Sequence, residues 1–246
     1  ETTAASDTAG QTCLADPVEV RYQLITEVAD LQAFLAIARE QGFVAVDTET
    51  TSLNAAAADL VGVAMALAPG NACYVPLRHG AAQNLATSRQ TGLDFDGVQE
   101  ATPIKQIPFD EAIALLREVF EDSAILKIGH NIKYDTHVLS RPANGDIKLH
   151  PVDDTMCLSY VLDTGVVNRH SMDYLADHWL DYQTIKYEDV CGKGGKQVSF
   201  AAIVPDAALD YAAEDADITL RLWQILKPRL AGSGVASVYE RLERPL

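Results

Sequence analysis

The sequence is poor in positive charge. It carries 19 Lys and Arg against 35 Asp and Glu, which gives a net charge of −16 at pH 7 with neutral histidines. Proteins that hold a nucleic-acid duplex through their overall field are usually basic. The charge balance therefore counts against a domain that grips a duplex by itself. It leaves room for a site that binds divalent cations, because clustered carboxylates lower the net charge and bound metal ions are not counted.

Cysteine pairs and long apolar runs are missing as well. The cysteines are widely separated and form no Cys-x-x-Cys pair: Cys13, Cys73, Cys157 and Cys191. This spacing gives no zinc signature and no disulfide framework, and it is typical of a reducing compartment. No apolar run reaches the roughly 18 residues that a membrane span needs, and no signal peptide is apparent. We therefore expect a cytoplasmic protein with no membrane association.

Apolar periodicity predicts an α/β fold with a mixed sheet flanked by helices. We expect strands at 22–26, 43–49, 60–67, 72–77 and 124–128, and helices at 28–39, 109–120, 131–139, 155–162, 172–180 and 205–230. The turn at Gly70-Asn71 favours an antiparallel hairpin, whereas helical connections favour parallel pairing of the later strands. Residues 1–17 have the composition of a flexible tail, and residues 78–108 that of a long surface loop.

Two carboxylates follow the most strongly apolar strand of the chain. Residues 43–46 are apolar, which indicates a central strand covered on both faces. Asp47 and Glu49 come next, and because alternate residues of a strand point the same way, their side chains share a face. Taken alone, this Asp-x-Glu pair is most simply a strand that runs out into an acidic turn.

Two more acids fall on apolar helix faces. Asp135 shares its stripe with Ile132, Val138 and Leu139, and Asp215 shares its stripe with Ala208, Tyr211, Ile218 and Leu222. The opposite stripe of the second helix has the composition of a solvated acidic face: Asp210, Glu214, Asp217 and Arg221. An inward carboxylate needs a cationic partner, and neither inward stripe nor the central strand supplies Lys or Arg.

Two divalent cations would neutralise the four inward carboxylates. Oxygen ligands are what Mg²⁺ prefers, and no Cys/His set favours zinc. Two such ions about 4 Å apart form a clamp for in-line displacement at phosphorus. Tyr211 lies one helical turn before Asp215 and could orient the attacking water. A lone inward tyrosine is also common as plain core packing.

These residues match three motifs of a known superfamily. Asp47-Thr-Glu49, Asn131-x-x-x-Asp135 and Tyr211-x-x-x-Asp215 resemble the motifs of the DEDD 3′–5′ exonucleases, and the tyrosine resembles the DEDDy branch. Longer strings resemble the proofreading exonuclease domains of bacterial DNA polymerase I: Asp154-Thr-Met156, the segment 169–179, the segment 211–217 and Glu243-Arg-Pro-Leu246. The resemblance runs from about residue 20 to the end.

The resemblance implies a ribonuclease H-like fold and a metal-dependent hydrolase. Two Mg²⁺ ions, which Mn²⁺ would replace, are expected to bind the carboxylates. Asp47 would bridge both ions, and Glu49 and Asp215 would hold the ion that carries the attacking water. Tyr211 with Glu49 would orient that water, and Asp135 would serve the second ion through coordinated water.

The resemblance also implies a set of DNA contacts. Leu53 would pack against the terminal base and Phe200 would stack nearby. Asn131, Tyr134 and Arg169 would lie along the strand. Without the resemblance, Leu53 and Phe200 are ordinary packing residues and Arg169 is a surface charge.

The domain organisation follows from the same comparison. Residues 1–17 would be a linker to a preceding 5′-nuclease domain, residues 18–242 the 3′–5′ exonuclease domain, and residues 243–246 the start of a polymerase module. The chain begins at Glu1 rather than Met, which we expect of a fragment. The implied protein is a monomeric, nucleoid-associated enzyme of bacterial replication and repair that trims single-stranded DNA 3′ ends.

Two alternatives stay open on the sequence alone. The first is an RNA-trimming exonuclease of the ribonuclease D kind, which would use the same chemistry. The second is an inactive module that only braces a polymerase, although all four acids and the tyrosine are present.

Overall fold

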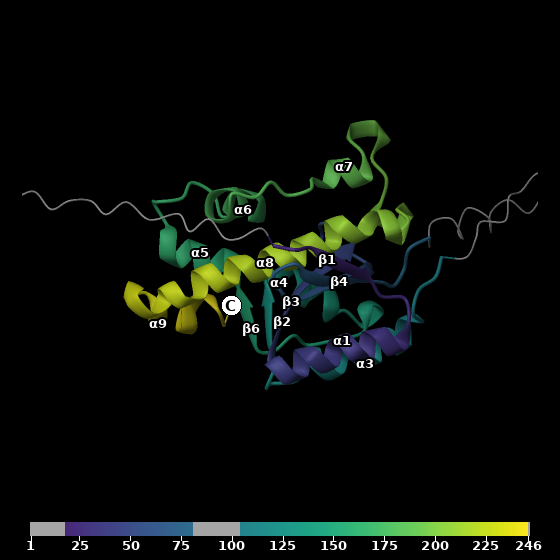
Figure 1. Ribbon diagram of the computed structural model, residues 1–246, viewed down its shortest axis with the longest axis horizontal. Helices are drawn as coiled ribbons and strands as arrows, with labels where there is room; N and C mark the ends of the chain where they lie inside the picture. Colours follow the sequence, from purple (N-terminus) through teal and green to yellow (C-terminus); the bar gives the residue numbers. More distant parts are fainter. Residues whose placement is uncertain (1–17, 81–103, 246) are drawn as a thin grey trace, which may run out of the picture.

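The computed structural model describes residues 18–80 and 104–245 (Figure 1). The predicted tail at 1–17 and most of the predicted loop at 78–108 lie outside the described residues.

The described residues form one six-stranded mixed sheet with the strand order β1-β4-β3-β2-β5-β6. Its strands are β1 (Arg21–Leu24), β2 (Phe43–Thr50), β3 (Leu60–Ala68), β4 (Asn71–Pro76), β5 (Leu126–Gly129) and β6 (Val152–Asp154). Strand β3 runs antiparallel to β2 and β4, which confirms the predicted hairpin. The β2–β5 and β5–β6 pairs are parallel, so the carboxyl ends of these three strands meet at one edge.

Helices cover both faces of the sheet (Figure 1). One face packs against α1 (Val28–Gln41), α3 (Phe109–Phe120) and α4 (Ile132–Leu139). The other face packs against the long helix α8 (Pro205–Ser233). Strand β2 serves both layers, because Val44 and Val46 face the first core and Ala45 faces the second. This alternation places Asp47 and Glu49, in the same phase as Ala45, on the α8 side.

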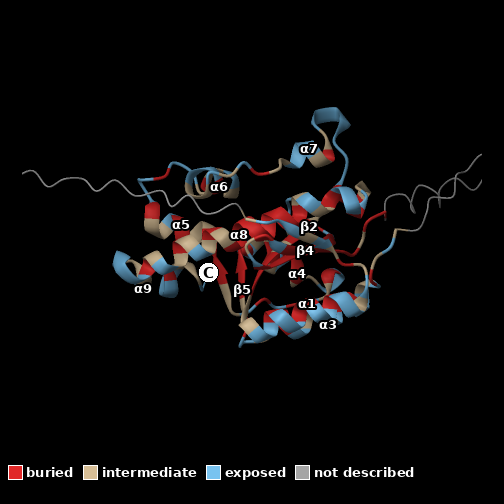
Figure 2. Cartoon of the chain, in the orientation of Figure 1, coloured by how far each residue is buried: buried red, intermediate tan, exposed pale blue. Residues whose placement is uncertain are grey.

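Small residues let α8 approach the sheet closely. The contact is made largely by alanines: Ala45, Ala64, Ala66 and Ala72 from the strands, and Ala208, Ala212, Ala213 and Ala216 from the helix. Figure 2 shows the buried residues concentrated in the sheet and in the part of α8 that lies over it. The helix is therefore held at a short, fixed distance from β2.

Shorter elements complete the fold beside the two layers. Helices α5 (Thr155–Asp163) and α6 (Met172–Leu180) pack on the second half of α8. The remaining elements are α7 (Tyr187–Cys191), α9 (Ala236–Val238), the 3-10 turns η1 (Pro142–Asn144), η2 (Gly194–Lys196) and η3 (Phe200–Ala202), and the π-helical turn η4 (Tyr239–Glu243). Within the described ranges, no helix has the length and apolar composition to span a bilayer.

The prediction that one face of α8 is solvated is wrong for two of the acids on that face. Glu214 and Asp217 are only 2% and 0% exposed. Glu214 accepts a hydrogen bond from the Tyr182 hydroxyl at 2.7 Å. Asp217 accepts from the Tyr22 hydroxyl at 2.9 Å and pairs with Arg221. Tyr182 and Tyr22 lie outside α8, which is why the pattern of this one helix did not reveal the burial of the two carboxylates.

The end of the described chain packs on the domain. Tyr239 is fully buried, and its hydroxyl donates to Asp153 Oδ1 at 3.0 Å. Arg244 Nε donates to the Val152 carbonyl oxygen at 2.7 Å. These contacts fix the C-terminal turn to strand β6, which the sequence pattern did not predict. The domain boundary at residue 242 stays a prediction.

Candidate active site

Three of the four predicted carboxylates converge where β2 meets α8. Asp47 and Glu49 come from the last half of β2, and Asp215 comes from the buried face of α8. One carboxylate oxygen from each of the three lies within 4.8 Å of the other two. Tyr211 lies one helical turn before Asp215 on the same helix.

A glycine makes room beside Glu49. Gly62 of β3 pairs directly with Glu49, and between Glu49 and Thr50 the register shifts, which marks a β-bulge at the end of the strand. A Cβ atom on Gly62 would lie 2.1 Å from the Tyr74 hydroxyl oxygen. Only glycine at this position leaves room for the buried Tyr74 ring, which lies over β3 next to the carboxylates.

Asp135 approaches from the other layer. It is 3% exposed, and its Oδ1 accepts hydrogen bonds from Thr48 N at 3.0 Å and Thr48 Oγ1 at 2.5 Å. Strand β5 pairs with β2 only as far as Ala45, so the Asp135 carboxylate bonds to β2 beyond the end of β5. Asp135 stays outside the cluster of three.

One buried aspartate orients the helix that carries Asp135. Asp154 accepts from Asn131 N and Ile132 N, each at 3.0 Å, at the start of α4. It also accepts from Met156 N at 2.8 Å, at the start of α5. A carboxylate is favourable at a helix N-terminus, and this one serves two.

The carboxylates open into a cavity of about 710 Å³. Its walls come from the end of β2 and the following loop, the start of α4, the segment from α7 to η3, and α8. The lining residues are Asp47, Thr48, Glu49, Thr50, Thr51, Ser52, Leu53, His130, Asn131, Tyr134, Asp135, Tyr187, Gln197, Val198, Ser199, Tyr211 and Asp215.

Burial raises the pKa values of all four acids, and repulsion between carboxylates adds to the rise in three of them. Burial raises the pKa of Asp47 from 3.8 to about 6. The pKa of Glu49 is raised well above its usual range, by burial first and then by the charges of Asp47, Asp215 and Asp135. Burial also raises the pKa values of Asp135 and Asp215, and the Asp47 charge adds to both. The pKa of Tyr211 is raised by burial and by the charges of Asp215, Glu49 and Asp47, so its hydroxyl stays protonated.

This donor set fits divalent cations. Among the described residues, no Lys, Arg or His forms an ion pair with Asp47, Glu49, Asp135 or Asp215. Glu49 Oε1 is buried, and no hydrogen-bond donor in the described part of the chain reaches it. Buried carboxylate oxygens that repel one another, one of them without a hydrogen-bond donor, fit a divalent cation better than a polar core closed by side-chain hydrogen bonds.

The family model for 3′–5′ exonucleases matches residues 22–231. The chain belongs to this 3′–5′ exonuclease family. Curated relatives agree: DNA polymerase I of Rhizobium leguminosarum is 43% identical over 234 residues, and that of Pseudomonas aeruginosa is 41% identical over 230 residues. These matches cover 92% and 93% of this chain but only 22% and 23% of the relatives. The predicted resemblance to the exonuclease domain of DNA polymerase I is thereby confirmed.

Solved structures share the fold of the exonuclease domain. The polymerase domain of Pol1 from M. smegmatis has a TM-score of 0.61 at 20% identity, over 91% of this chain and 30% of that one. Escherichia coli RNase D has a TM-score of 0.60 at 16% identity, over 88% and 47%. Brucella melitensis NrnC bound to pGG has a TM-score of 0.58 at 23% identity, over 89% and 84%. The predicted ribonuclease H-like fold is confirmed.

Three of the five predicted DNA contacts line the cavity of the exonuclease domain. Leu53 is 96% exposed at the loop after β2. Asn131 precedes α4 with a left-handed backbone (φ 59°), and Tyr134 donates from its hydroxyl to the Ser52 carbonyl oxygen at 2.5 Å. Each presents atoms to the same space as the carboxylates.

The other two predicted contacts do not line this cavity. Phe200 is fully buried and packs against Tyr211 and Tyr187, with ring centroids 5.9 Å and 6.4 Å apart. Arg169 is exposed in the loop between α5 and α6. A contact of either residue with DNA stays a prediction.

Thr48, Tyr187 and His130 are among the cavity residues that the sequence analysis did not predict as site residues. Thr48 holds Asp135 through two hydrogen bonds, and its position between the two motif acids was the available signal. Tyr187 is 38% exposed and lines the cavity from the five-residue helix α7, which is too short to give a periodic signal. His130 lines it from the residue after β5, and burial lowers its pKa to about 4.

Proposed function

We propose that the domain hydrolyses the terminal phosphodiester of a single-stranded or frayed DNA 3′ end and releases nucleoside 5′-monophosphates. The convergence of Asp47, Glu49 and Asp215 within 4.8 Å, with Asp135 across the same cavity, carries this proposal. Four carboxylates without a cationic side chain match the charge of two divalent ions, and their hard oxygen donors favour Mg²⁺, with Mn²⁺ as a substitute.

The carboxylates divide between two metal positions. Asp47 would belong to both, Glu49 and Asp215 to one, and Asp135 to the other. When bound, the two ions supply Lewis acidity at the scissile phosphate and lower the pKa of an attacking water. Thr48 fixes one oxygen of Asp135 and thereby turns the carboxylate toward the cavity.

Tyr211 and Glu49 are placed to orient the water. The Tyr211 hydroxyl stays protonated, because burial and the neighbouring carboxylates raise its pKa. It lies against Asp215 and opens to the cavity next to Glu49. A protonated phenol beside a carboxylate can hold a water by one donated and one accepted hydrogen bond. A water held in this way would keep its other lone pair free for attack on the phosphorus atom.

The cavity suits a single strand rather than a duplex. Leu53 and Tyr187 present apolar surface to it, and single strands are bound largely by stacking on such surfaces. A net charge of −16 disfavours a broad electrostatic grip on a duplex. In the longer protein, polymerase and 5′-nuclease domains would supply that grip, and the domain would proofread newly made DNA as a monomer in the bacterial cytoplasm, at the nucleoid.

DNA is favoured over RNA by the relatives. The fold is shared with RNase D, so the fold alone does not choose between the two substrates. Relatives at 43% and 41% identity are DNA polymerases, which favours DNA. An inactive brace would have no use for unpaired buried acids, which cost stability unless they bind something.

A pair of labelled oligonucleotides tests the proposal. Single-stranded DNA and RNA of equal length, labelled at the 5′ end, are incubated with the domain in Mg²⁺. We expect stepwise shortening of the DNA, loss of activity in Asp47→Ala, and normal activity in Asp210→Asn, which removes an exposed charge from α8. Activity that survives excess chelator would refute the metal dependence, and faster shortening of RNA would favour the ribonuclease alternative.

A further inference from the structure

The loop between β2 and β3 presents an almost bare leucine. Leu53 is 96% exposed, so its side chain has next to no packing within the domain. Its location relative to the carboxylates therefore depends on the backbone of residues 51–59. The loop is closed at its base, because Thr51 N donates to Asp59 O and Asp59 N donates to Thr51 Oγ1, both at 3.0 Å.

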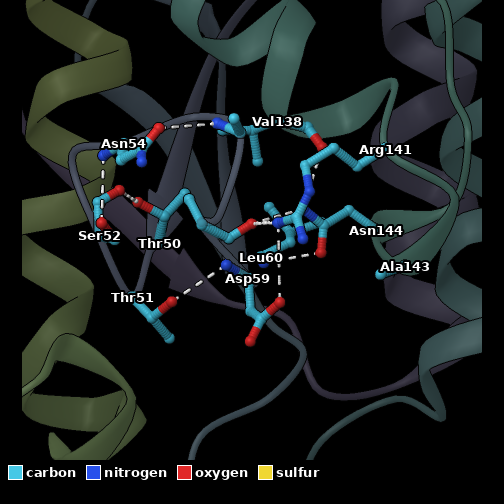
Figure 3. A network of polar contacts seen from close by, with 12 residues as sticks. Thr50, Thr51, Ser52, Asn54, Asp59, Leu60, Val138, Arg141, Ala143 and Asn144 are labelled. Carbon is cyan, nitrogen blue, oxygen red and sulfur yellow. Dashed lines mark hydrogen bonds and ion pairs between the residues drawn. The ribbon is translucent and has the colours of Figure 1, made fainter.

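Asn144 ties the rear of this loop to α4 (Figure 3). The residue is fully buried, and its Nδ2 donates to Ala58 O at 2.9 Å and to Val138 O at 3.0 Å. Its Oδ1 accepts from Leu60 N at 3.0 Å and from Arg78 Nη1 at 3.1 Å. Every donor and acceptor position of the amide is used, so one side chain joins helix, loop and strand.

Two further contacts tie the same parts together. Arg141 donates to Ala58 O and lies 3.7 Å from the Asp59 carboxylate. At the front of the loop, the Tyr134 hydroxyl donates to Ser52 O. Both attachments lead to α4 or the turn that follows it, and α4 also carries Asp135. The loop that bears Leu53 is thus attached to the same helix, α4, that carries the active-site residue Asp135.

We propose that Asn144, assisted by Arg141, is a positioning residue for Leu53. It sets where the terminal base rests and hence which phosphodiester reaches the carboxylates. This inference rests on the proposed function. Asn144 is not among the residues that line the cavity; it contacts the loop through Ala58 O and α4 through Val138 O, and the loop contact is the one that leads to Leu53.

The test compares two DNA ends. Single-stranded oligonucleotides end at the 3′ side either in thymidine or in an abasic nucleotide, which offers no base to Leu53. The 246-residue chain and its variants are assayed in Mg²⁺ for kcat and KM on each end. The variants are Asn144→Ala, Arg141→Met, Leu53→Ala and the double variant Asn144→Ala/Leu53→Ala. Ser140→Ala is the control, because within the described ranges the hydroxyl of this residue, at the end of α4, bonds only to His137 O.

A positioning role predicts a loss confined to the end that carries a base. Asn144→Ala should lower kcat/KM on the thymidine end by about tenfold or more, because small misplacements of a reacting group are costly. On the abasic end it should match the wild type within about twofold, and in the Leu53→Ala background it should cause no further loss. Arg141→Met should show the same pattern with a smaller loss of kcat/KM. If Asn144→Ala does not fold, Arg141→Met takes its place in the test.

Other outcomes overturn the inference. Equal losses on both ends, or losses that multiply in the double variant, would assign Asn144 a general structural role. If the wild type shortens both ends and Leu53→Ala leaves the two rates unchanged, the inference fails while the exonuclease function stands. If the wild type shortens neither end, the proposed function fails and the inference falls with it.

Discussion

Removing one charge from the carboxylate cluster should stabilise the domain when metal is absent. The change is Asp47→Asn. Burial raises the Asp47 pKa from 3.8 to about 6, a difference of roughly two units or about 3 kcal/mol between the folded and unfolded chains. Asp47 borders the cavity, where water screens its charge, so we expect about 1–2 kcal/mol in practice.

The sign of the effect follows from proton binding. Because the pKa of this carboxyl is higher in the folded state, the folded chain binds more protons between pH 3.8 and about 6. Stability is therefore lost as the pH rises through this window, and the loss is complete above it. At pH 8 in chelator, Asp47→Asn should melt about 2–8 °C above the wild type. At pH 5 the difference should shrink to about half.

Magnesium should reverse the order of stability. A ligand that binds only the folded chain stabilises it by about 2.7 kcal/mol at a concentration of 100 Kd. The wild type gains this stabilisation from bound Mg²⁺, whereas Asp47→Asn lacks the carboxylate that both ion positions would share. At saturating Mg²⁺ the wild type should melt higher than the variant.

Thermal unfolding followed by circular dichroism measures both effects. Asp210→Asn removes one exposed charge from α8 and controls for the change in net charge. It should shift the melting temperature little, with or without Mg²⁺. If Asp47→Asn melts below the wild type in chelator at pH 8, the buried charge of Asp47 does not destabilise the folded domain, and the reasoning fails.

Three more changes probe the site and its support. Tyr211→Phe should lower kcat about 10- to 1000-fold with little change in KM, because only the hydroxyl is lost; an unchanged kcat in steady-state assays would contradict its role. Tyr187→Ala should raise KM for single-stranded DNA about tenfold by removing a stacking surface, and an unchanged KM would show that the strand does not touch it. Lys127→Met should lower the free energy of unfolding by about 3 kcal/mol, because Asp122 O, Ile125 O and His150 O lose their buried donor. Urea unfolding beside the exposed control Lys148→Met measures this, and equal midpoints for the two variants would contradict it.

The sequence predicts the frame of this fold well, because the frame is periodic. The apolar run before Asp47 identified the central strand β2, and the turn signal identified the β3–β4 hairpin, although the two turn residues are Pro69-Gly70 rather than the predicted Gly70-Asn71. The helix 109–120 has the bounds that its apolar spacing predicts. Strand β6 was missed, because its three residues Val152–Asp154 include two acids that tertiary partners neutralise. Asp153, for example, is fully buried against Trp223 and Lys227.

Site residues were predictable where a single helix showed a conflict between an acidic side chain and its apolar surroundings. Asp135 and Asp215 each sit on an apolar stripe without a cation, and a single helix is enough to expose that conflict. Tyr187 was not predictable, because its place depends on how the segment after α6 folds back over α8. Phe200 shows the opposite limit. The family resemblance points to this residue, but only the packed aromatic cluster reveals that Tyr187 and Tyr211 cover it.

Helix α8 makes the site intolerant of length changes. Tyr211 and Asp215 stand on one uninterrupted helix, and Glu214 and Asp217 on the same helix are locked to partners elsewhere in the fold. One extra residue between Tyr211 and Asp215 would turn the tyrosine by about 100° and shift it about 1.5 Å along the axis. No side-chain rotamer would restore its place beside Asp215. Insertions and deletions between these two residues should therefore be far more damaging than any single replacement of the alanines between them.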